Sequence, residues 1–288
     1  MRDQAEELRM RMLQSQNKLG RSIAVVSGKG GVGKSNFSTN FTTTLSGIGK
    51  KVVLIDMDIG MGNIHILLGK TTPANLKDYL VGEKSIEEVL FEGPNNLQYI
   101  SGGSGLSGVM EWTEEMFSRL IQAFEYLQKH YDYIVFDMGA GATSQALDLL
   151  VSVDDIIVIS TAEPTSITDA YSMMKYIYYK DPDKNFFLLC NRAFSEEEGI
   201  DTTSRLELAM SRFLSKEVFV LGTLPEDPVV RKSVKEQVPF SILYPNAEIT
   251  KKMKQIVNRF TDYKLEEEPT SKQSKFISRL KSLFSGRA

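Results

Sequence analysis

Hydrophobic positions between residues 22 and 263 fall into short apolar runs, which are separated by longer stretches with helical periodicity. A short apolar run bounded by polar residues is typical of a strand buried on both faces of a parallel sheet. The stretches between these runs, such as 114–130, 167–179 and 203–213, place apolar residues on one helical face. This alternation predicts an α/β fold, a doubly wound and mostly parallel sheet with helices on both faces. The predicted strands are Ile23–Val26, Val52–Ile55, Leu97–Ile100, Tyr133–Phe136, Ile156–Ser160, Phe186–Cys190 and Val218–Leu221.

A glycine-rich stretch joins the first predicted strand to a helix that starts near Asn36. Strand, glycine loop and helix form the context of a phosphate-binding loop, in which backbone N–H groups and the helix N-terminus face the phosphates. Lys34 supplies a charge for the β- and γ-phosphates, and Ser35 supplies a hydroxyl for Mg²⁺. A plain glycine-rich turn is the alternative, but it requires neither of these side chains. The predicted nucleotide-binding residues of this loop are Gly28, Lys29, Gly30, Gly31, Val32, Gly33, Lys34, Ser35 and Asn36.

Carboxylates follow two of the predicted strands at the ends where ligands bind in such sheets. Asp56 and Asp58 close the second strand, and this pair fits a metal site, a catalytic base or solvated loop charges. Asp137 ends the apolar strand Tyr133–Phe136, which is the pattern of a Walker B strand. Its carboxylate is therefore predicted to reach Mg²⁺ through a water molecule.

The second lysine of the loop, Lys29, is not needed in an ordinary phosphate-binding loop. With it, the segment 28–35 resembles the deviant Walker A motif of the MinD/ParA family of ATPases. The resemblance implies that ATP is the nucleotide, that ATP induces a homodimer, and that Lys29 reaches the phosphates of the partner subunit. It makes Lys29, Lys34 and Asp58 the catalytic residues: Asp58 positions the attacking water and is also a candidate Mg²⁺ ligand. Two roles stay open for Asp56, a contact to Mg²⁺ and support of the helix after the loop.

The same resemblance extends to the γ-phosphate and to the base. Gly141 lies in a Gly-Ala-Gly segment like that of the flagellar branch of the family, where a backbone N–H contacts the γ-phosphate. Asn191 matches the family asparagine that bonds adenine, and Arg192 is a candidate to stack on the base. The residues that match the loop flanking the base are Pro225, Glu226 and Asp227.

Residues 1–20 read as an amphipathic helix that lies outside the α/β repeat. The segment Asp3–Arg9 resembles the N-terminal activator motif of the FlhG (YlxH/FleN) branch of the MinD family, the regulators of flagellar number. In that branch the segment inserts into the GTPase FlhF and stimulates it, with Gln4 as the inserted residue here. The resemblance also implies flagellar C-ring and basal-body proteins as partners. A helix that simply packs on its own domain is the alternative.

The domain organisation follows as an activator helix at 1–20, an ATPase domain at 21–263, a polar linker at 264–270 and a C-terminal helix at 271–288. Basic residues occupy the other positions of this last helix, as in helices that lie on anionic membranes. A peripheral position at the inner face of the cell membrane is therefore expected for the ATP-bound protein, and docking onto the ATPase domain or a partner is the alternative. The residues of the apolar face are Phe276, Ile277, Leu280, Leu283 and Phe284.

Composition and charge argue against several other classes of protein. The 288 residues carry a net charge of −3, which makes bulk attraction to nucleic acid, as in a ParA-type partition ATPase, unlikely. Cys190 is the single cysteine, so the paired cysteines of an iron–sulfur carrier are missing. No apolar run approaches the length of a membrane span, and the N-terminus is not a secretory signal, so a cytoplasmic protein is expected. A septum-placing MinD remains a rival, although MinD starts almost directly at the first strand.

Overall fold

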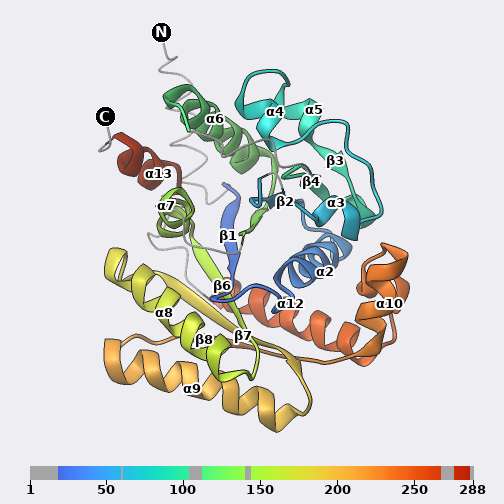
Figure 1. Cartoon of the computed structure of the whole chain (residues 1–288), viewed down its shortest axis with the longest axis vertical. Coiled ribbons are helices and arrows are strands. Elements are labelled where there is room, and N and C mark those ends of the chain that lie inside the picture. Colours follow the sequence, from blue (N-terminus) through green and yellow to red (C-terminus); the bar gives the residue numbers. More distant parts are fainter. Residues whose placement is uncertain (1–18, 60, 104–111, 140–143, 267–275, 286–288) are drawn as a thin grey trace.

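A single eight-stranded sheet forms the centre of the computed structural model, which describes residues 19–59, 61–103, 112–139, 144–266 and 276–285 (Figure 1). The strand order is β3-β4-β2-β5-β1-β6-β7-β8, and only the pairing of β3 with β4 is antiparallel. The doubly wound, mostly parallel sheet predicted from the sequence is thereby confirmed. The strands are β1 (Arg21–Val26), β2 (Val52–Asp56), β3 (Phe91–Glu92), β4 (Gln98–Ile100), β5 (Tyr133–Asp137), β6 (Asp155–Ser160), β7 (Asn185–Ala193) and β8 (Phe219–Pro225).

Helices cover both faces of this sheet (Figure 1). One face carries α4 (Leu76–Leu80), α5 (Ile86–Val89), α6 (Glu114–His130), α7 (Ser144–Ser152), α8 (Pro164–Lys180), α9 (Glu196–Leu214) and α13 (Phe276–Ser285). The other carries α2 (Lys34–Gly47), α3 (Ile64–Leu67), α11 (Phe240–Leu243) and α12 (Glu248–Glu266), with α10 (Pro228–Glu236) beside α11. A 3₁₀ turn at Pro94–Asn96 precedes β4.

Alternation of side chains along the strands divides the core into two layers. In β1, Ala24 and Val26 enter the layer under α6 and α7, while Ile23 and Val25 enter the layer under α2 and α12. Successive residues of a strand point to opposite faces, so an uninterrupted apolar strand is needed when both faces are covered. The apolar runs of the sequence therefore mark the central strands correctly.

Several elements differ from the sequence-based predictions, among them β8, which ends at Pro225 instead of Leu221. The two-residue strand β3 was not expected, because a strand this short has no periodicity to detect. Helix α9 begins at Glu196, earlier than the predicted segment 203–213, where the Ser195 hydroxyl accepts the N–H of Glu198. Helix α12 continues through Glu266, so the predicted linker at 264–270 is wrong for its first residues. Lys264, Leu265 and Glu266 are good helix formers and extend the helix by one turn.

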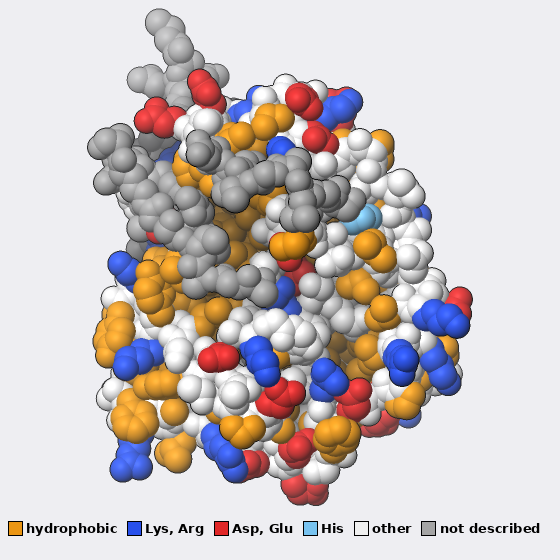
Figure 2. All heavy atoms as spheres, viewed as in Figure 1, with side chains coloured by type: hydrophobic (Ala, Val, Ile, Leu, Met, Phe, Trp, Pro, Cys, Tyr) orange, Lys and Arg blue, Asp and Glu red, His pale blue; other side chains and the backbone are white. Residues whose placement is uncertain are grey.

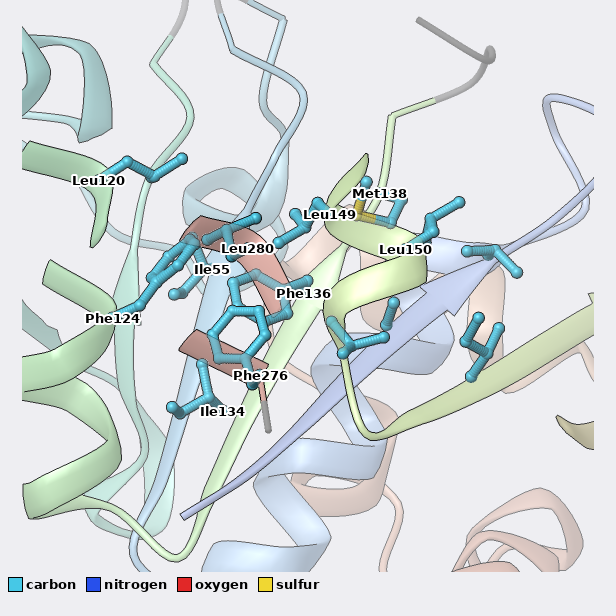
Figure 3. Packing of buried hydrophobic residues seen from close by; sticks show 14 of the residues in the cluster. Ile55, Leu120, Phe124, Ile134, Phe136, Met138, Leu149, Leu150, Phe276 and Leu280 are labelled. Atoms are coloured by element: carbon cyan, nitrogen blue, oxygen red, sulfur yellow. The ribbon is translucent and has the colours of Figure 1, made fainter. Parts of the chain in front are cut away.

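The C-terminal helix α13 packs against α6 and α7 on its own domain (Figures 1 and 3). Phe276 and Leu280 are both 0% exposed, and Ile277 is 8% exposed. The ring of Phe276 lies 5.3 Å from that of Phe124 in α6 and 5.7 Å from that of Phe136 in β5. In this conformation the three residues are therefore docked onto the ATPase domain, which was the alternative to a membrane contact. The side chains of Leu283 and Phe284 lie outside the described residues.

Among the described residues, no helix combines the length and the apolar character that a membrane span requires.

Candidate functional site

The phosphate-binding loop connects β1 to α2 at the carboxyl edge of the sheet, between the ends of β5 and β6. Gly33 caps α2 with a left-handed φ of 91°, and a Cβ there would lie 2.5 Å from Nδ2 of Asn191. Only glycine fits both the dihedral angle and the space. Since Gly33 has no side chain to cap the helix, the first N–H groups of α2, at Lys34 and Ser35, remain available to an anion. The loop therefore has the form that a phosphate requires.

Lys34 and Asp137 are brought together across the loop as predicted. Nζ of Lys34 lies 3.2 Å from Oδ1 of Asp137, and the two side chains are 11% and 3% exposed. Ser38, one helical turn after Lys34, donates its hydroxyl to the same oxygen at 2.9 Å. Asp137 is thus held from two positions on α2. Ser38 was not predicted as a site residue, although its spacing of four from Lys34 places it on the same helical face.

Asp56 is a buried carboxyl group opposite Asp137. The two residues are register partners at the ends of β2 and β5. Burial, followed by repulsion from Asp137, raises the pKa of Asp56 from 3.8 to about 7. Its Oδ1 accepts the N–H of Asp58 and its Oδ2 accepts the N–H of Ile64, which fixes the segment after β2. Asp56 contacts this segment rather than α2, so the predicted support of the helix after the loop is not its role here.

The raised pKa predicts a pH dependence of stability. Between about pH 4 and pH 7 the folded protein binds a proton on Asp56 that the unfolded chain has lost, so stability falls as pH rises through this window. A shift of three units sets an upper limit of about 4 kcal/mol on this effect. Urea unfolding without Mg²⁺ or nucleotide, at about pH 5 and about pH 8, should show the loss in the wild type and a smaller loss in Asp56→Asn. Equal pH slopes for the two proteins would contradict the assignment.

Asp58 lies beside Gly139, at the start of the loop after β5: a Cβ on Gly139 would be 3.5 Å from Cγ of Asp58. Gly139 is the second residue after Asp137, and the role of Asp58 near the γ-phosphate stays a prediction. Within the described part of the chain, no three His, Cys, Asp or Glu side chains are grouped so that they hold a metal ion. The donor set fits Mg²⁺, which takes one or two protein oxygens and completes its shell with phosphates and water. Ser35, Asp58 and Asp137 remain the residues predicted to contact it.

Lys29 points out of the loop, away from Lys34. Its Nζ donates to Oε2 of Glu163 at 2.8 Å and to Oγ1 of Thr165 at 3.3 Å, at the start of α8. The side chains of Lys29 and Glu163 are 44% and 60% exposed, so the pair lies at the surface. The hydrogen bond from Lys29 lowers the pKa of Glu163. Lys29 is therefore held in its own subunit by a contact that sequence analysis did not find.

A cavity of about 430 Å³ lies next to the loop, between β7, β8 and α10. Its lining contains every residue predicted to contact the base, Asn191, Arg192, Pro225, Glu226 and Asp227, together with Gly33 and Asn36. Nδ2 of Asn191 donates to the carbonyl oxygen of Val32 at 2.8 Å. Nε of Arg192 donates to Glu226 at 2.8 Å, with the Arg192 backbone at a left-handed φ of 60°. The five residues thus line one cavity, together with Arg231, which was not predicted as a site residue; their contact with the base stays a prediction.

Two predicted contacts, Gln4 and Gly141, lie outside the described residues, as does nearly all of the predicted helix 1–20.

Comparison with known proteins identifies the family. The family described as ParA, "NUBPL iron-transfer P-loop NTPase", matches residues 18–261. The antiactivator FleN of Pseudomonas aeruginosa is 31% identical over 258 residues, covering 90% of this chain and 92% of that protein. The flagellum site-determining protein YlxH of Helicobacter pylori is 34% identical, covering 81% and 79%. The chain belongs to the MinD/ParA family of P-loop ATPases and is of the FlhG type.

Solved structures support the fold of this FlhG-type chain. The cell division ATPase MinD of Pyrococcus furiosus has a TM-score of 0.69 at 24% identity, covering 85% of this chain and all of that one. A MinD of Pyrococcus horikoshii with the same TM-score was solved as a complex with Mg-ADP. A nucleotide with Mg²⁺ thus suits the fold. The single cysteine of the chain, Cys190, is buried, and burial raises the pKa of its thiol to about 11.

Proposed function

We propose that this protein is an ATP-dependent dimerising switch at the membrane that regulates the number and placement of flagella and stimulates the GTPase FlhF. The names of its relatives FleN and YlxH support the flagellar role. The observation that carries the dimer is Lys29, an exposed lysine in a phosphate-binding loop that already has Lys34. A cation that turns away from its own nucleotide site is suited to the nucleotide of a second subunit. Hydrolysis then returns the dimer to monomers, and slow turnover serves as a timer.

Each residue of the site has a defined part in this proposal. On ATP binding, Lys34 exchanges Asp137 for the β- and γ-phosphates, while the hydroxyl of Ser38 keeps Asp137 in place for Mg²⁺. Mg²⁺ supplies charge neutralisation at the phosphates. Asp58 orients the water that attacks the γ-phosphate. Nδ2 of Asn191 donates one N–H to the carbonyl oxygen of Val32, which fixes the side-chain amide and leaves Oδ1 as an acceptor for the amino group of adenine.

Replacing Lys29 with alanine is expected to abolish ATP-dependent dimerisation and to leave nucleotide affinity within about two-fold, since Lys34 still holds the phosphates. Size-exclusion chromatography with light scattering measures the first quantity and calorimetry with ADP the second. Glu163→Gln is the matched control: it removes the negative charge that attracts Lys29 within its own subunit, so its dimer should form at least as readily. A normal ATP dimer of Lys29→Ala contradicts the role across the interface.

Basic residues do not gather in one region on the face shown in Figure 2, where they alternate with acidic and apolar side chains. The net charge of −3 supports a protein partner or a membrane rather than DNA. A ParA-type partition ATPase needs a basic surface to hold the phosphate backbone, and its binding would weaken steeply with salt. A gel shift with duplex DNA that disappears at raised salt would favour that rival.

The partner proposal is tested by a pull-down of FlhF and C-ring proteins on the immobilised full chain, with and without ATP. FlhF should be retained by the wild type and stimulated in GTP hydrolysis, and Gln4→Ala should lose the stimulation. Dimerisation and ATP hydrolysis of Gln4→Ala should stay unchanged, because the α/β domain starts at β1, beyond this segment. Wild-type stimulation by Gln4→Ala, or retention of septum-site proteins in place of flagellar ones, would refute this part of the proposal.

A further inference from the structure

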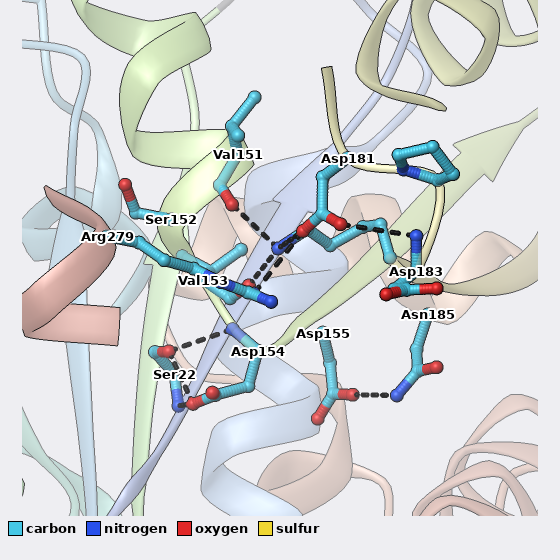
Figure 4. A network of polar contacts seen from close by, with 12 residues as sticks. Ser22, Val151, Ser152, Val153, Asp154, Asp155, Asp181, Asp183, Asn185 and Arg279 are labelled. Carbon is cyan, nitrogen blue, oxygen red and sulfur yellow. Dashed lines mark hydrogen bonds and ion pairs between the residues drawn. The ribbon is translucent and has the colours of Figure 1, made fainter. Parts of the chain in front are cut away.

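A fully buried lysine, Lys184, contacts the C-terminal end of α7. Figure 4 labels its partners Val151, Val153 and Asp181. Lys184, in the turn between α8 and β7, has a side chain that is 0% exposed. Its Nζ donates to the carbonyl oxygen of Val151 at 2.8 Å and also to that of Val153. These carbonyls belong to the last turn of α7 and the residue after it, which have no helical partner of their own. The hydrogen bonds of Lys184 therefore depend on the position of the C-terminal end of α7.

One carboxylate joins this lysine to the C-terminal helix. Oδ2 of Asp181 lies 3.2 Å from Nζ of Lys184 and 3.3 Å from Nη1 of Arg279 in α13. Asp181 is 14% exposed and Arg279 is 36% exposed, so the junction is only partly screened by water. Asp154, which accepts from the backbone and hydroxyl of Ser22, is the other carboxylate that acts on Lys184. Two cations thus share Asp181, and they repel each other.

We propose that Lys184 couples the position of α7 to the release of α13 by competing with Arg279 for Asp181; this inference rests on the proposed membrane function. While α7 is in place, its two carbonyls accept from the Lys184 ammonium, and Oδ2 of Asp181 lies within ion-pair distance of both Lys184 and Arg279. When the end of α7 moves away, a buried ammonium without these acceptors turns fully to Asp181, because an unpaired buried charge is costly. Arg279 then loses its anchor, and α13 loosens.

The position of α7 makes it suitable as the moving element. It begins at Ser144, shortly after the loop that follows Asp137, so nucleotide-dependent changes near Asp137 and Gly139 reach it first along the chain. Leu149 and Leu150 of α7 belong to the same apolar cluster as Phe276 and Leu280 of α13 (Figure 3). A displacement of α7 thus disturbs the apolar contact and the ionic contact of α13 together. The shared carboxylate provides the physical connection that a coupling claim needs.

Two substitutions at this junction have opposite expected effects. Arg279→Gln removes only the anchor of the tail, and hydrogen exchange of residues 276–285 in the nucleotide-free protein should rise by about two- to five-fold, the range for a half-exposed ion pair. Lys184→Met removes the competitor, so Asp181 should hold Arg279 in every nucleotide state. Wild-type exchange should rise by about 5–150-fold with a non-hydrolysable ATP analogue, the range of ordinary coupling free energies, and Lys184→Met should suppress this rise.

Lys281→Gln is the matched control, since Lys281 anchors α13 to Glu125 of α6 without touching Asp181. It should raise exchange in both states and leave the effect of the ATP analogue intact. Lys184→Gln, a second uncharged variant that keeps a donor for the carbonyls of α7, guards against a folding defect of Lys184→Met. A wild-type response in both Lys184 variants overturns the coupling. If the ATP analogue does not raise hydrogen exchange of α13 in the wild type, then ATP does not release α13. If only the flagellar role is wrong, the expected hydrogen-exchange rates are unchanged.

Discussion

Replacing Asp58 with alanine is expected to slow ATP turnover by about 10²–10⁴-fold, the usual loss when a group that orients the reacting water or its proton is removed. The reason is its position: Asp58 lies beside Gly139 after the Walker B strand, while Lys34 and Ser38 hold Asp137. Alanine removes the Mg²⁺ contact predicted for Asp58 itself but leaves Lys34, Ser35 and Asp137 in place for the phosphates and Mg²⁺. The variant should therefore still bind ATP and dimerise, and single-turnover measurements should place the loss in the chemical step.

Asp56→Asn serves as the comparison for this experiment. Asp56 carries a raised pKa of about 7 and bonds to backbone N–H groups of the segment that bears Asp58. Its amide replacement keeps one acceptor, so turnover should fall much less than in Asp58→Ala. Wild-type turnover in Asp58→Ala would exclude it from catalysis, and an equal loss in both variants would mean that the shape of the segment, rather than the Asp58 carboxylate, limits the rate.

Much of this site follows from local sequence because strand ends meet at one edge of a parallel sheet. Asp137 ends β5, Asn191 lies near the end of β7, and Lys34 begins the helix that follows β1; the topology brings these strand ends together around the loop. Residue types at those positions then indicate phosphate, Mg²⁺ and base. The five residues predicted to contact the base could be grouped for the same reason, although they come from β7 and β8 and the turn after it.

Other properties depend on neighbours that no local pattern identifies. The raised pKa of Asp56 comes from burial and from Asp137, its register partner on β5, and this pairing is known only once the strand order is known. The contact of Lys29 with Glu163 requires the start of α8 to lie against the loop. The apolar face of the tail was visible in the sequence, but a lipid surface and a groove formed by Phe124 and Phe136 bury such a face equally well.

Removing residues 271–288 is expected to abolish recruitment to anionic liposomes in the presence of ATP. Each basic residue near an anionic surface contributes roughly 1 kcal/mol, and a buried large apolar side chain contributes about 1.5–3 kcal/mol. The structure adds an opposing term, because Phe276, Ile277 and Leu280 are already buried against the domain and must leave it first. A single tail should then bind membrane weakly. Liposome flotation with ATP, with ADP and without nucleotide measures the effect.

Dimerisation resolves this competition between domain and membrane. Two tails held in one ATP dimer bind together, and the effective concentration of the second raises avidity by about 10²–10⁴-fold without any new contact. Lys29→Ala is the decisive comparison, since it keeps the tail and should lack the dimer, so its recruitment should fall to the level seen with ADP. The tail-deleted protein should still dimerise with ATP. Equal flotation of wild type and tail-deleted protein would restrict α13 to its place on the domain, and strong flotation of Lys29→Ala would make release of one tail sufficient. If neither of these two results is observed, membrane attachment depends on ATP because ATP determines whether one tail or two tails are available. The contacts of α13 with α6 and α7 then determine the ATP concentration needed for attachment.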